Sequence, residues 1–125
     1  MACLWQSFIN KQSDVMTTNS KLTPMQQALQ LAQSAANNGE VPVGAVIVGP
    51  EGIVAQAGNR TRELNDPTAH AETLAIRAAC AALGQERLTG FDLYVTLEPC
   101  PMCAAAISNA RIKRLYFGAG DPKSG

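Results

Sequence analysis

The sequence predicts an α/β fold of three layers, α/β/α, built around a mixed sheet. Two strand-like apolar runs, at residues 43–48 and 53–57, are joined by a short Gly/Pro connection that is typical of an antiparallel hairpin. Helix-like and strand-like segments then alternate along the chain, as they do when parallel strands are layered with helices. The length of 125 residues suits one domain with a single core. We therefore expect a mostly parallel, mixed sheet covered by helices.

A first helix is expected before the hairpin. Thr23 is a good N-cap, Pro24 suits the first helical position, and Gly39 is a typical terminator. Apolar residues recur along one face of this helix, at positions 25, 28, 29, 32, 35 and 36. This pattern predicts that the helix packs with one face on the sheet.

The hairpin and the second helix follow. Residues 49–52, with the sequence Gly-Pro-Glu-Gly, predict a four-residue loop between the first two strands. A helix is predicted over residues 69–83, with Thr68 as its N-cap and Gly84 as its end. The chain should return from this helix to the sheet in the next strand.

Two strands and one helix complete the predicted domain. Residues 93–97 and 114–118 have the composition of strands, and residues 101–109 that of a helix. If Pro101 takes the first helical position, Cys100 is the N-cap of this helix and Cys103 lies in its first turn. The positive end of the helix dipole there favours thiolates, which are the form of cysteine that binds metal.

The composition excludes several classes of protein. Hydrophobic residues make up 46% and charged residues 16%, which predicts a compact, soluble globule rather than a disordered chain. The ten basic and ten acidic residues cancel, so any affinity for an anionic partner needs a local patch. Arg111, Lys113 and Arg114 could form a phosphate contact, although solvated charge beside a strand is the simpler interpretation. No window approaches the roughly 20 apolar residues of a membrane helix.

Residues 1–20 are expected to form a poorly ordered leader before a domain at residues 21–125. They are rich in Gln, Ser, Asn and Thr, show no periodicity, and lack the features of a secretory signal. Met16 is an alternative start. We therefore expect the reducing cytoplasm, where a close pair of cysteines indicates a metal or redox site rather than a crosslink.

Two short motifs carry the chemistry. The first is His-Ala-Glu at residues 70–72, which holds the chain's single histidine, and the second is Pro-Cys-Pro-Met-Cys at residues 99–103. Alone, the first could be a packed or capping histidine, and the second could be a redox pair or two buried thiols. Both motifs open helices, and the second directly follows a strand, which is where sites form in α/β folds. The combination predicts a zinc site.

His70, Cys100 and Cys103 supply three ligands. Three protein ligands are typical of catalytic zinc, because the fourth tetrahedral position stays open to water. Cys80 cannot close the site, since ten residues of helix place it about 15 Å from His70 along the axis. Cys3 could reach the site only if the leader folded back. The ligand count therefore favours catalysis over a structural site.

Glu72 is the candidate proton shuttle. Residues two apart on a regular helix do not share a face, so His70 and Glu72 can converge only in a distorted first turn. A carboxylate beside a zinc-activated water can take its proton and pass it to a ring nitrogen and then to a leaving amine. Such transfers amount to hydrolytic deamination.

The chain resembles the zinc-dependent nucleobase deaminases, and more specifically the bacterial tRNA-specific adenosine deaminases, from about residue 24 to residue 125. Besides the two motifs, the resemblance is carried by residues 40–45, 58–60, 66–72, 93–103 and 117–119 and by Asp121. It implies a cytidine-deaminase-like fold and one Zn²⁺ per chain held by the ligands named above, with Glu72 as the acid/base. It also implies a homodimer that converts adenosine to inosine at the wobble position of a tRNA anticodon stem-loop.

The resemblance further implies substrate contacts. Asn59 matches an asparagine that hydrogen-bonds the flipped nucleotide, Val41 and Pro42 match apolar pocket walls, and Asp121 matches a position near the RNA backbone. From the residues alone, Asn59 and Asp121 could equally be turn residues. Val41 and Pro42 could simply pack at the entry to a strand.

Two other functions stay open at this point. Zinc-dependent deaminases of a free base or nucleoside, such as guanine, cytosine or cytidine, share both motifs. The chain also ends at Asp-Pro-Lys-Ser-Gly, where the family that it resembles continues through further helices. An inactive, zinc-stabilised fragment is therefore the second alternative.

Overall fold

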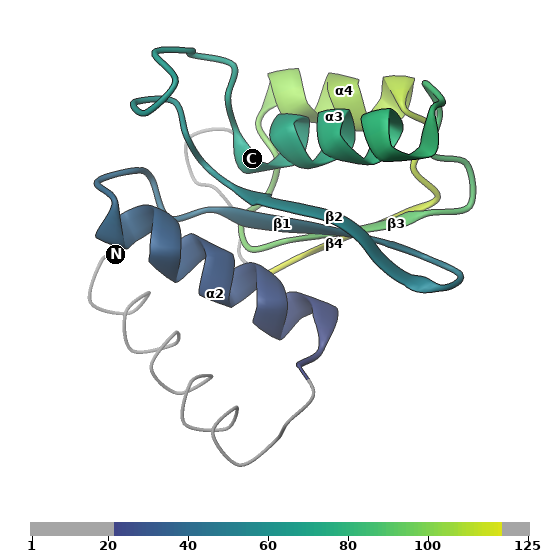
Figure 1. Cartoon of the computed structure of the whole chain (residues 1–125), viewed down its shortest axis with the longest axis horizontal. Coiled ribbons are helices and arrows are strands. Elements are labelled where there is room, and N and C mark those ends of the chain that lie inside the picture. The colour runs from purple at the N-terminus through teal and green to yellow at the C-terminus, as the bar shows by residue number, and fades with distance from the viewer. Residues whose placement is uncertain (1–21, 119–125) are drawn as a thin grey trace.

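The computed structural model describes residues 22–118, so that the predicted leader and Asp121 lie outside the described residues. The elements are α2 (Pro24–Asn37), β1 (Gly44–Gly49), β2 (Gly52–Gly58), α3 (Ala71–Leu83), β3 (Asp92–Val95), α4 (Pro101–Asn109) and β4 (Arg114–Phe117). Helix α2 lies on one face of the sheet, and α3 and α4 lie on the other (Figure 1). The predicted three-layer α/β/α fold is confirmed.

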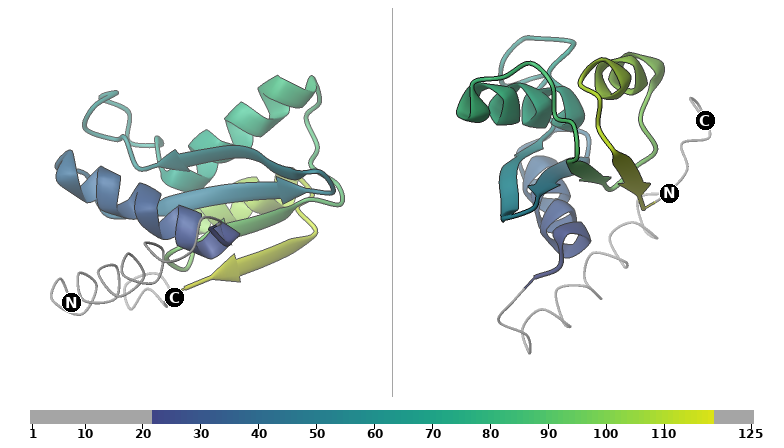
Figure 2. Two further views of the ribbon diagram at one scale, coloured as in Figure 1. Left: turned by 60° about the horizontal axis from the view of Figure 1, so that its bottom comes forward. Right: turned by 90° about the vertical axis from the view of Figure 1, so that its right-hand side faces the viewer.

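The sheet is mixed and has the strand order β2-β1-β3-β4. Strand β1 pairs antiparallel with both β2 and β3, whereas β3 and β4 pair in parallel. The alternation of strands and helices does make β2, β3 and β4 point the same way. The expectation of a mostly parallel sheet is nevertheless wrong for the described strands, because β1 lies between β2 and β3 and runs against both. Figure 2 shows β4 at the edge of the sheet.

The hairpin turn is shorter than the predicted four-residue loop. Gly49 pairs with Gly52, which leaves only Pro50 and Glu51 in the turn. Gly52 has φ 118, a conformation that L side chains rarely adopt. The Gly49–Gly52 pair therefore extends the two strands by one pair beyond the apolar runs at the turn.

The start of α2 is as predicted. Thr23 is the N-cap, its Oγ1 accepts from the Gln26 N–H at 3.2 Å, and the Gln26 side chain accepts from the Thr23 N–H at 2.9 Å. The buried face of the helix consists mainly of small residues, Ala28, Leu29, Ala32 and Ala35. Small side chains let α2 approach the sheet closely, and at Gly44 no room is left for a side chain.

We expect Gly44→Ala to lower the free energy of unfolding by about 3 kcal/mol. A Cβ on Gly44 would lie 2.0 Å from the Ala28 carbonyl oxygen and 2.9 Å from the Ala32 nitrogen, and neither backbone atom can yield unless α2 shifts. Gly49→Ala is the matched control, since its Cβ would meet the Phe91 ring at 2.6 Å and a ring can rotate away. Urea unfolding measures both variants. Equal losses in the two would contradict this account.

The main core lies between the sheet and the helices α3 and α4. Strands β1 and β3 supply Ala45, Ile47, Leu93 and Val95, which pack with the alanines of α3 and with Ile107 of α4. The core thus fixes the starts of α3 and α4 at neighbouring places over the sheet. Within residues 22–118, no helix combines the length and apolar character that a bilayer crossing requires.

Candidate metal centre

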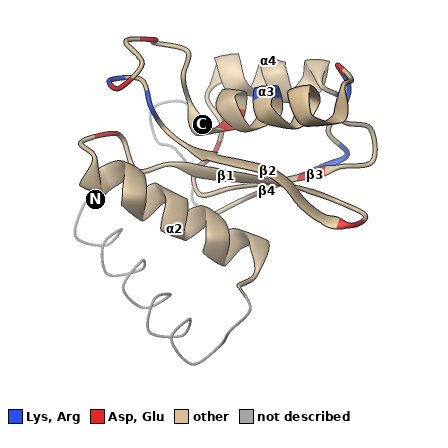
Figure 3. Ribbon diagram, in the orientation of Figure 1, with Lys and Arg blue, Asp and Glu red and all other residues tan. Residues whose placement is uncertain are grey.

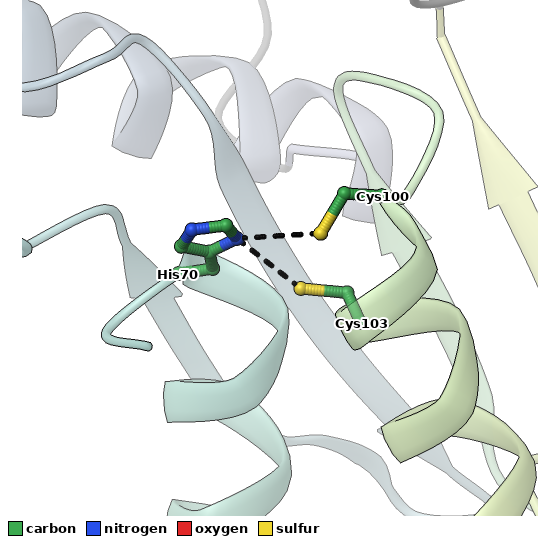
Figure 4. A group of neighbouring side chains, drawn as sticks. All are labelled: His70, Cys100 and Cys103. Atoms are coloured by element: carbon green, nitrogen blue, oxygen red, sulfur yellow. Dashed lines mark hydrogen bonds between the residues drawn. The ribbon is translucent and has the colours of Figure 1, made fainter. Parts of the chain in front are cut away.

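The candidate metal centre lies between the first turns of α3 and α4. His70 is the N-cap of α3 and Cys100 the N-cap of α4, and neither side chain caps its own helix. Cys103 follows in the first turn of α4, where Pro101 takes the first position as predicted. The three side chains point toward one another across the space between the helices (Figure 4). Residues thirty apart in the sequence thereby share one site.

The spacing of the three ligand atoms fits a zinc ion. His70 Nδ1 lies 3.6 Å from Cys100 Sγ and 3.4 Å from Cys103 Sγ, and all three atoms lie within 4.8 Å of one another. Zinc bonds of about 2.3 Å to sulfur and about 2.0 Å to nitrogen separate tetrahedral ligands by about 3.5 Å. One ring nitrogen and two sulfurs are also the donors that zinc prefers.

The surroundings of Cys103 favour its neutral thiol unless a cation is bound. Its side chain is fully buried, and burial, with Glu72 and Cys100 beside it, raises the pKa of the thiol far above its ordinary value. Without a positive charge this sulfur stays protonated. A metal ion removes that penalty, because it stabilises the thiolate directly.

Glu72 lies against the same cluster. It is the second residue of α3 and only 4% exposed. Burial raises the pKa of its carboxyl, and this is opposed by its own backbone N–H, by His70 and by a hydrogen bond with Cys103. His70 and Glu72 meet at the site because His70 precedes the first helical turn instead of lying within it. The structure thus places a buried carboxyl next to the three metal-ligand candidates.

Helix α3 starts later than predicted, and Thr68 is not its N-cap. The Thr68 hydroxyl and N–H both donate to the Asp66 carboxylate, at 2.7 and 2.9 Å, so this threonine closes a turn before the helix. Asn59 instead serves the start of α3, since its Oδ1 accepts from the Ala71 N–H at 2.7 Å. The cap therefore comes from the end of β2 and leaves the His70 side chain to the metal site.

In the described part of the chain, the side-chain amide of Asn59 has its oxygen engaged and its NH2 group free. Its side chain is buried, with 7% of the residue exposed, and the bond to Ala71 fixes which way the amide faces. Among residues 22–118, its Nδ2 group has no hydrogen-bond partner. A ligand that meets Asn59 would therefore meet a donor.

The predicted pocket-wall residues form a tight turn beside Asn59. The Val43 N–H donates to the Val41 carbonyl at 2.8 Å around Pro42, whose fixed φ suits such a turn. The Asn59 N–H in turn donates to the Val43 carbonyl at 3.1 Å. Val41 is 57% exposed.

Glu40 is a residue whose role the sequence analysis did not predict. Its buried carboxylate accepts from the Thr61 hydroxyl at 3.4 Å and from the N–H groups of Arg62 and Glu63 at 3.1 and 2.9 Å. Burial alone would raise the pKa of Glu40, but these hydrogen bonds lower it below the ordinary value. We call these three hydrogen bonds to the Glu40 carboxylate the Glu40 clamp. Its contribution to stability is fully present above the ordinary pKa of a glutamate and is lost as the pH falls through the lowered pKa of Glu40. No local pattern reveals it, because its partners lie 21 to 23 residues away.

We expect Glu40→Gln to loosen the loop over residues 60–66 without loss of zinc. Glutamine keeps one acceptor oxygen where glutamate has two, so the N–H of Arg62 or of Glu63 loses its acceptor. Hydrogen exchange at these two amides should accelerate, while elemental analysis finds the wild-type zinc content. Glu51→Gln in the exposed hairpin turn is the control and should leave both readings alone. Unchanged exchange in Glu40→Gln would refute the clamp.

Comparisons with known proteins agree with this geometry. The family model of the cytidine and deoxycytidylate deaminase zinc-binding region matches residues 18–119. A tRNA-specific adenosine deaminase of Agrobacterium fabrum is 67% identical over 101 residues, which make up 81% of this chain and 66% of that relative. The chain thus spans just under two thirds of the length of that relative.

Two solved structures share the fold. One comes from biochemical and structural studies of A-to-I editing by tRNA:A34 deaminases. It is 67% identical to this chain and has a TM-score of 0.80, and the match covers 82% of this chain and 74% of the chain in that structure. The other is a guanine deaminase from Bacillus subtilis, which is 45% identical and has a TM-score of 0.75. That match covers 78% of this chain and 62% of the guanine deaminase chain. With the family model spanning most of its length, the chain belongs to the cytidine and deoxycytidylate deaminase family and carries that family's zinc-binding region.

Proposed function

We propose that this chain deaminates adenosine to inosine at the wobble position of a tRNA. The observation that carries the proposal is the buried Glu72 carboxyl beside the cluster of His70, Cys100 and Cys103, since hydrolytic deamination needs an activated water and a proton shuttle together. The Agrobacterium relative at 67% identity supports a tRNA adenosine as substrate, compared with 45% for the guanine deaminase.

The residues divide the chemistry between them. The zinc that His70, Cys100 and Cys103 would hold supplies a Lewis acid, which lowers the pKa of water at the site toward 7. Glu72 takes one proton from a water at the site and delivers it to N1 of the adenine ring, and it then carries the second proton, from the new hydroxyl at C6, to the amine. The water oxygen bonds to C6 and the amine leaves as ammonia. Adenosine and water thus become inosine and ammonia, and Glu72 ends as it began.

The remaining site residues would position the nucleotide. Asn59 would donate from Nδ2 to an acceptor on the flipped nucleotide, because its Oδ1 is engaged by Ala71. Val41 and Pro42 would form an apolar wall beside it. Asp121, which lies outside the described residues, would accept from a ribose 2′-OH, a group that DNA lacks. We further propose that the enzyme works in the cytoplasm as a homodimer.

The test is turnover on two kinds of substrate. The purified, zinc-loaded chain is incubated with an anticodon stem-loop that carries adenosine at the wobble position, and inosine is read by sequencing. Parallel reactions with guanine, cytosine and cytidine are followed by ammonia release. We expect inosine in the stem-loop and no ammonia from the small substrates. Ammonia from a small substrate alone would replace the proposal with a free-base or nucleoside deaminase, and zinc without any turnover would indicate an inactive domain.

A further inference from the structure

A hollow of about 550 Å³ lies between α3, α4 and the segments that follow them. Three arginines line it, Arg77 from α3, Arg87 from the segment after α3, and Arg111 from the segment after α4, together with one acidic residue, Glu86. The whole chain has ten basic and ten acidic residues, so this local excess of positive charge is a departure from the average surface. Figure 3 shows the charged residues mainly in loops, with one basic position in α3.

The charges of the hollow are available to a ligand. Within residues 22–118, Arg87 and Arg111 form no ion pair, and Arg77 only approaches Asp66, at 4.0 Å, with both side chains exposed. Such an exposed contact is weak. Arg114, by contrast, donates to both carboxylate oxygens of Asp92, at 3.1 and 3.3 Å. In the basic cluster of residues 111–114, Arg114 is therefore paired with Asp92, whereas Arg111 has no ion pair within residues 22–118.

The backbone holds two of the arginines together. The Leu88 N–H donates to the Ala110 carbonyl at 2.6 Å, and Leu88 is fully buried. This bond fixes the residues next to it, Arg87 and Arg111, against each other at the end of α4. Arg111 also has φ 63, a left-handed conformation that is uncommon in residues other than glycine. The pair is thus built into the fold rather than carried on a free loop.

The hollow adjoins the metal centre. Thr73 lines it, and the Thr73 hydroxyl donates to the His70 carbonyl at 3.0 Å. Arg77 comes seven residues after His70, which is about 10 Å along the helix axis. That distance equals about three nucleotides of a stacked strand at 3.4 Å each. A strand with one nucleotide in the metal site is therefore long enough to reach Arg77.

We propose that Arg77, Arg87 and Arg111 bind backbone phosphates of the RNA whose target adenosine occupies the metal site. The inference rests on the proposed function. Guanidinium groups match phosphate oxygens in a two-pronged geometry, and several such groups around a hollow suit a multiply charged strand. The contact reads no base, so it contributes affinity and register but no sequence preference.

The salt dependence of stem-loop binding tests the proposal. Arg77→Gln, Arg87→Gln and Arg111→Gln should each weaken binding several-fold and flatten the slope of log K against log[salt] by about 0.7 to 0.9, the change expected for one lost phosphate contact. Arg114→Gln removes the same charge outside the hollow and should keep the wild-type slope. Glu86→Gln makes the hollow more positive and should tighten binding. Zinc content and thermal melting should stay as in the wild type.

The outcomes separate this proposal from the proposed function. If the wild-type chain deaminates the stem-loop but the hollow variants keep its slope, or if Arg114→Gln loses as much, the phosphate site is refuted and the function stands. If the wild-type chain neither binds nor deaminates the stem-loop, both fail. A changed oligomeric state in the hollow variants by light scattering, at an unchanged slope, would assign the hollow to a second copy of the chain instead.

Discussion

Cys103→Ala should purify without tightly bound zinc and without deaminase activity. The proposed site has three protein ligands, and the loss of one removes about a third of a zinc binding free energy of about 10 to 16 kcal/mol. That corresponds to about two to four decades in affinity. The remaining nitrogen and sulfur, His70 Nδ1 and Cys100 Sγ, 3.6 Å apart, then form a two-ligand site that a chelator empties. Cys100→Ala should behave in the same way.

The control for this loss is Cys80→Ala. Cys80 lies on α3, ten residues beyond His70, and packs against the core. The substitution therefore removes a thiol that is not part of the metal cluster. Elemental analysis after dialysis against a weak chelator should find wild-type zinc in Cys80→Ala and none in Cys103→Ala. Added zinc should raise the melting temperature of the wild-type apoprotein and leave that of Cys103→Ala unchanged. Wild-type zinc content in Cys103→Ala would sink the assignment of this ligand.

Local chemistry made some elements predictable. Thr23, Pro24 and Pro101 mark helix starts through their own side chains, and both helices begin where these residues place them. The start of α3 was missed because its cap is Asn59, which lies 12 residues earlier in the sequence. The expectation of a mostly parallel sheet was wrong because it also depends on a contact between distant residues. The pairing of β1 with β3 joins segments that no local pattern connects.

The site shows the same division between local and distant contacts. The two motifs predicted that His70 and the two cysteines lie at helix starts. Because zinc prefers these side chains as ligands, the sequence also predicted that they form one site. The Glu40 clamp joins a carboxylate to backbone N–H groups beyond the next hairpin. In the arginine hollow, a backbone hydrogen bond from Leu88 to Ala110 links the segments that carry Arg87 and Arg111. These contacts join backbone groups to partners more than ten residues away, so no local sequence pattern reveals them.

Glu72→Gln should lower kcat about 10²- to 10⁴-fold and leave the zinc content unchanged. Glutamine has the size and shape of glutamate, so it fills the same buried space at the start of α3 without opening a cavity. It cannot take a proton from water at neutral pH or return one to the leaving amine. The variant therefore removes the proposed proton shuttle and keeps the proposed metal ligands, whereas Cys103→Ala removes a proposed ligand and keeps the shuttle.

Single-turnover rates on the wobble-adenosine stem-loop, measured at saturating RNA, isolate this step from binding. Glu72→Gln should retain wild-type affinity for the stem-loop, because the carboxylate acts on the reacting atoms and not on the backbone, and it should melt close to the wild-type temperature. Arg114→Gln, outside both the site and the hollow, should react at the wild-type rate. Loss of zinc from Glu72→Gln would make Glu72 a fourth ligand and the site a closed, structural one. A wild-type rate with zinc in place would mean that the proton travels through another group. A slow rate with zinc and RNA both bound leaves proton transfer as the step that Glu72 performs.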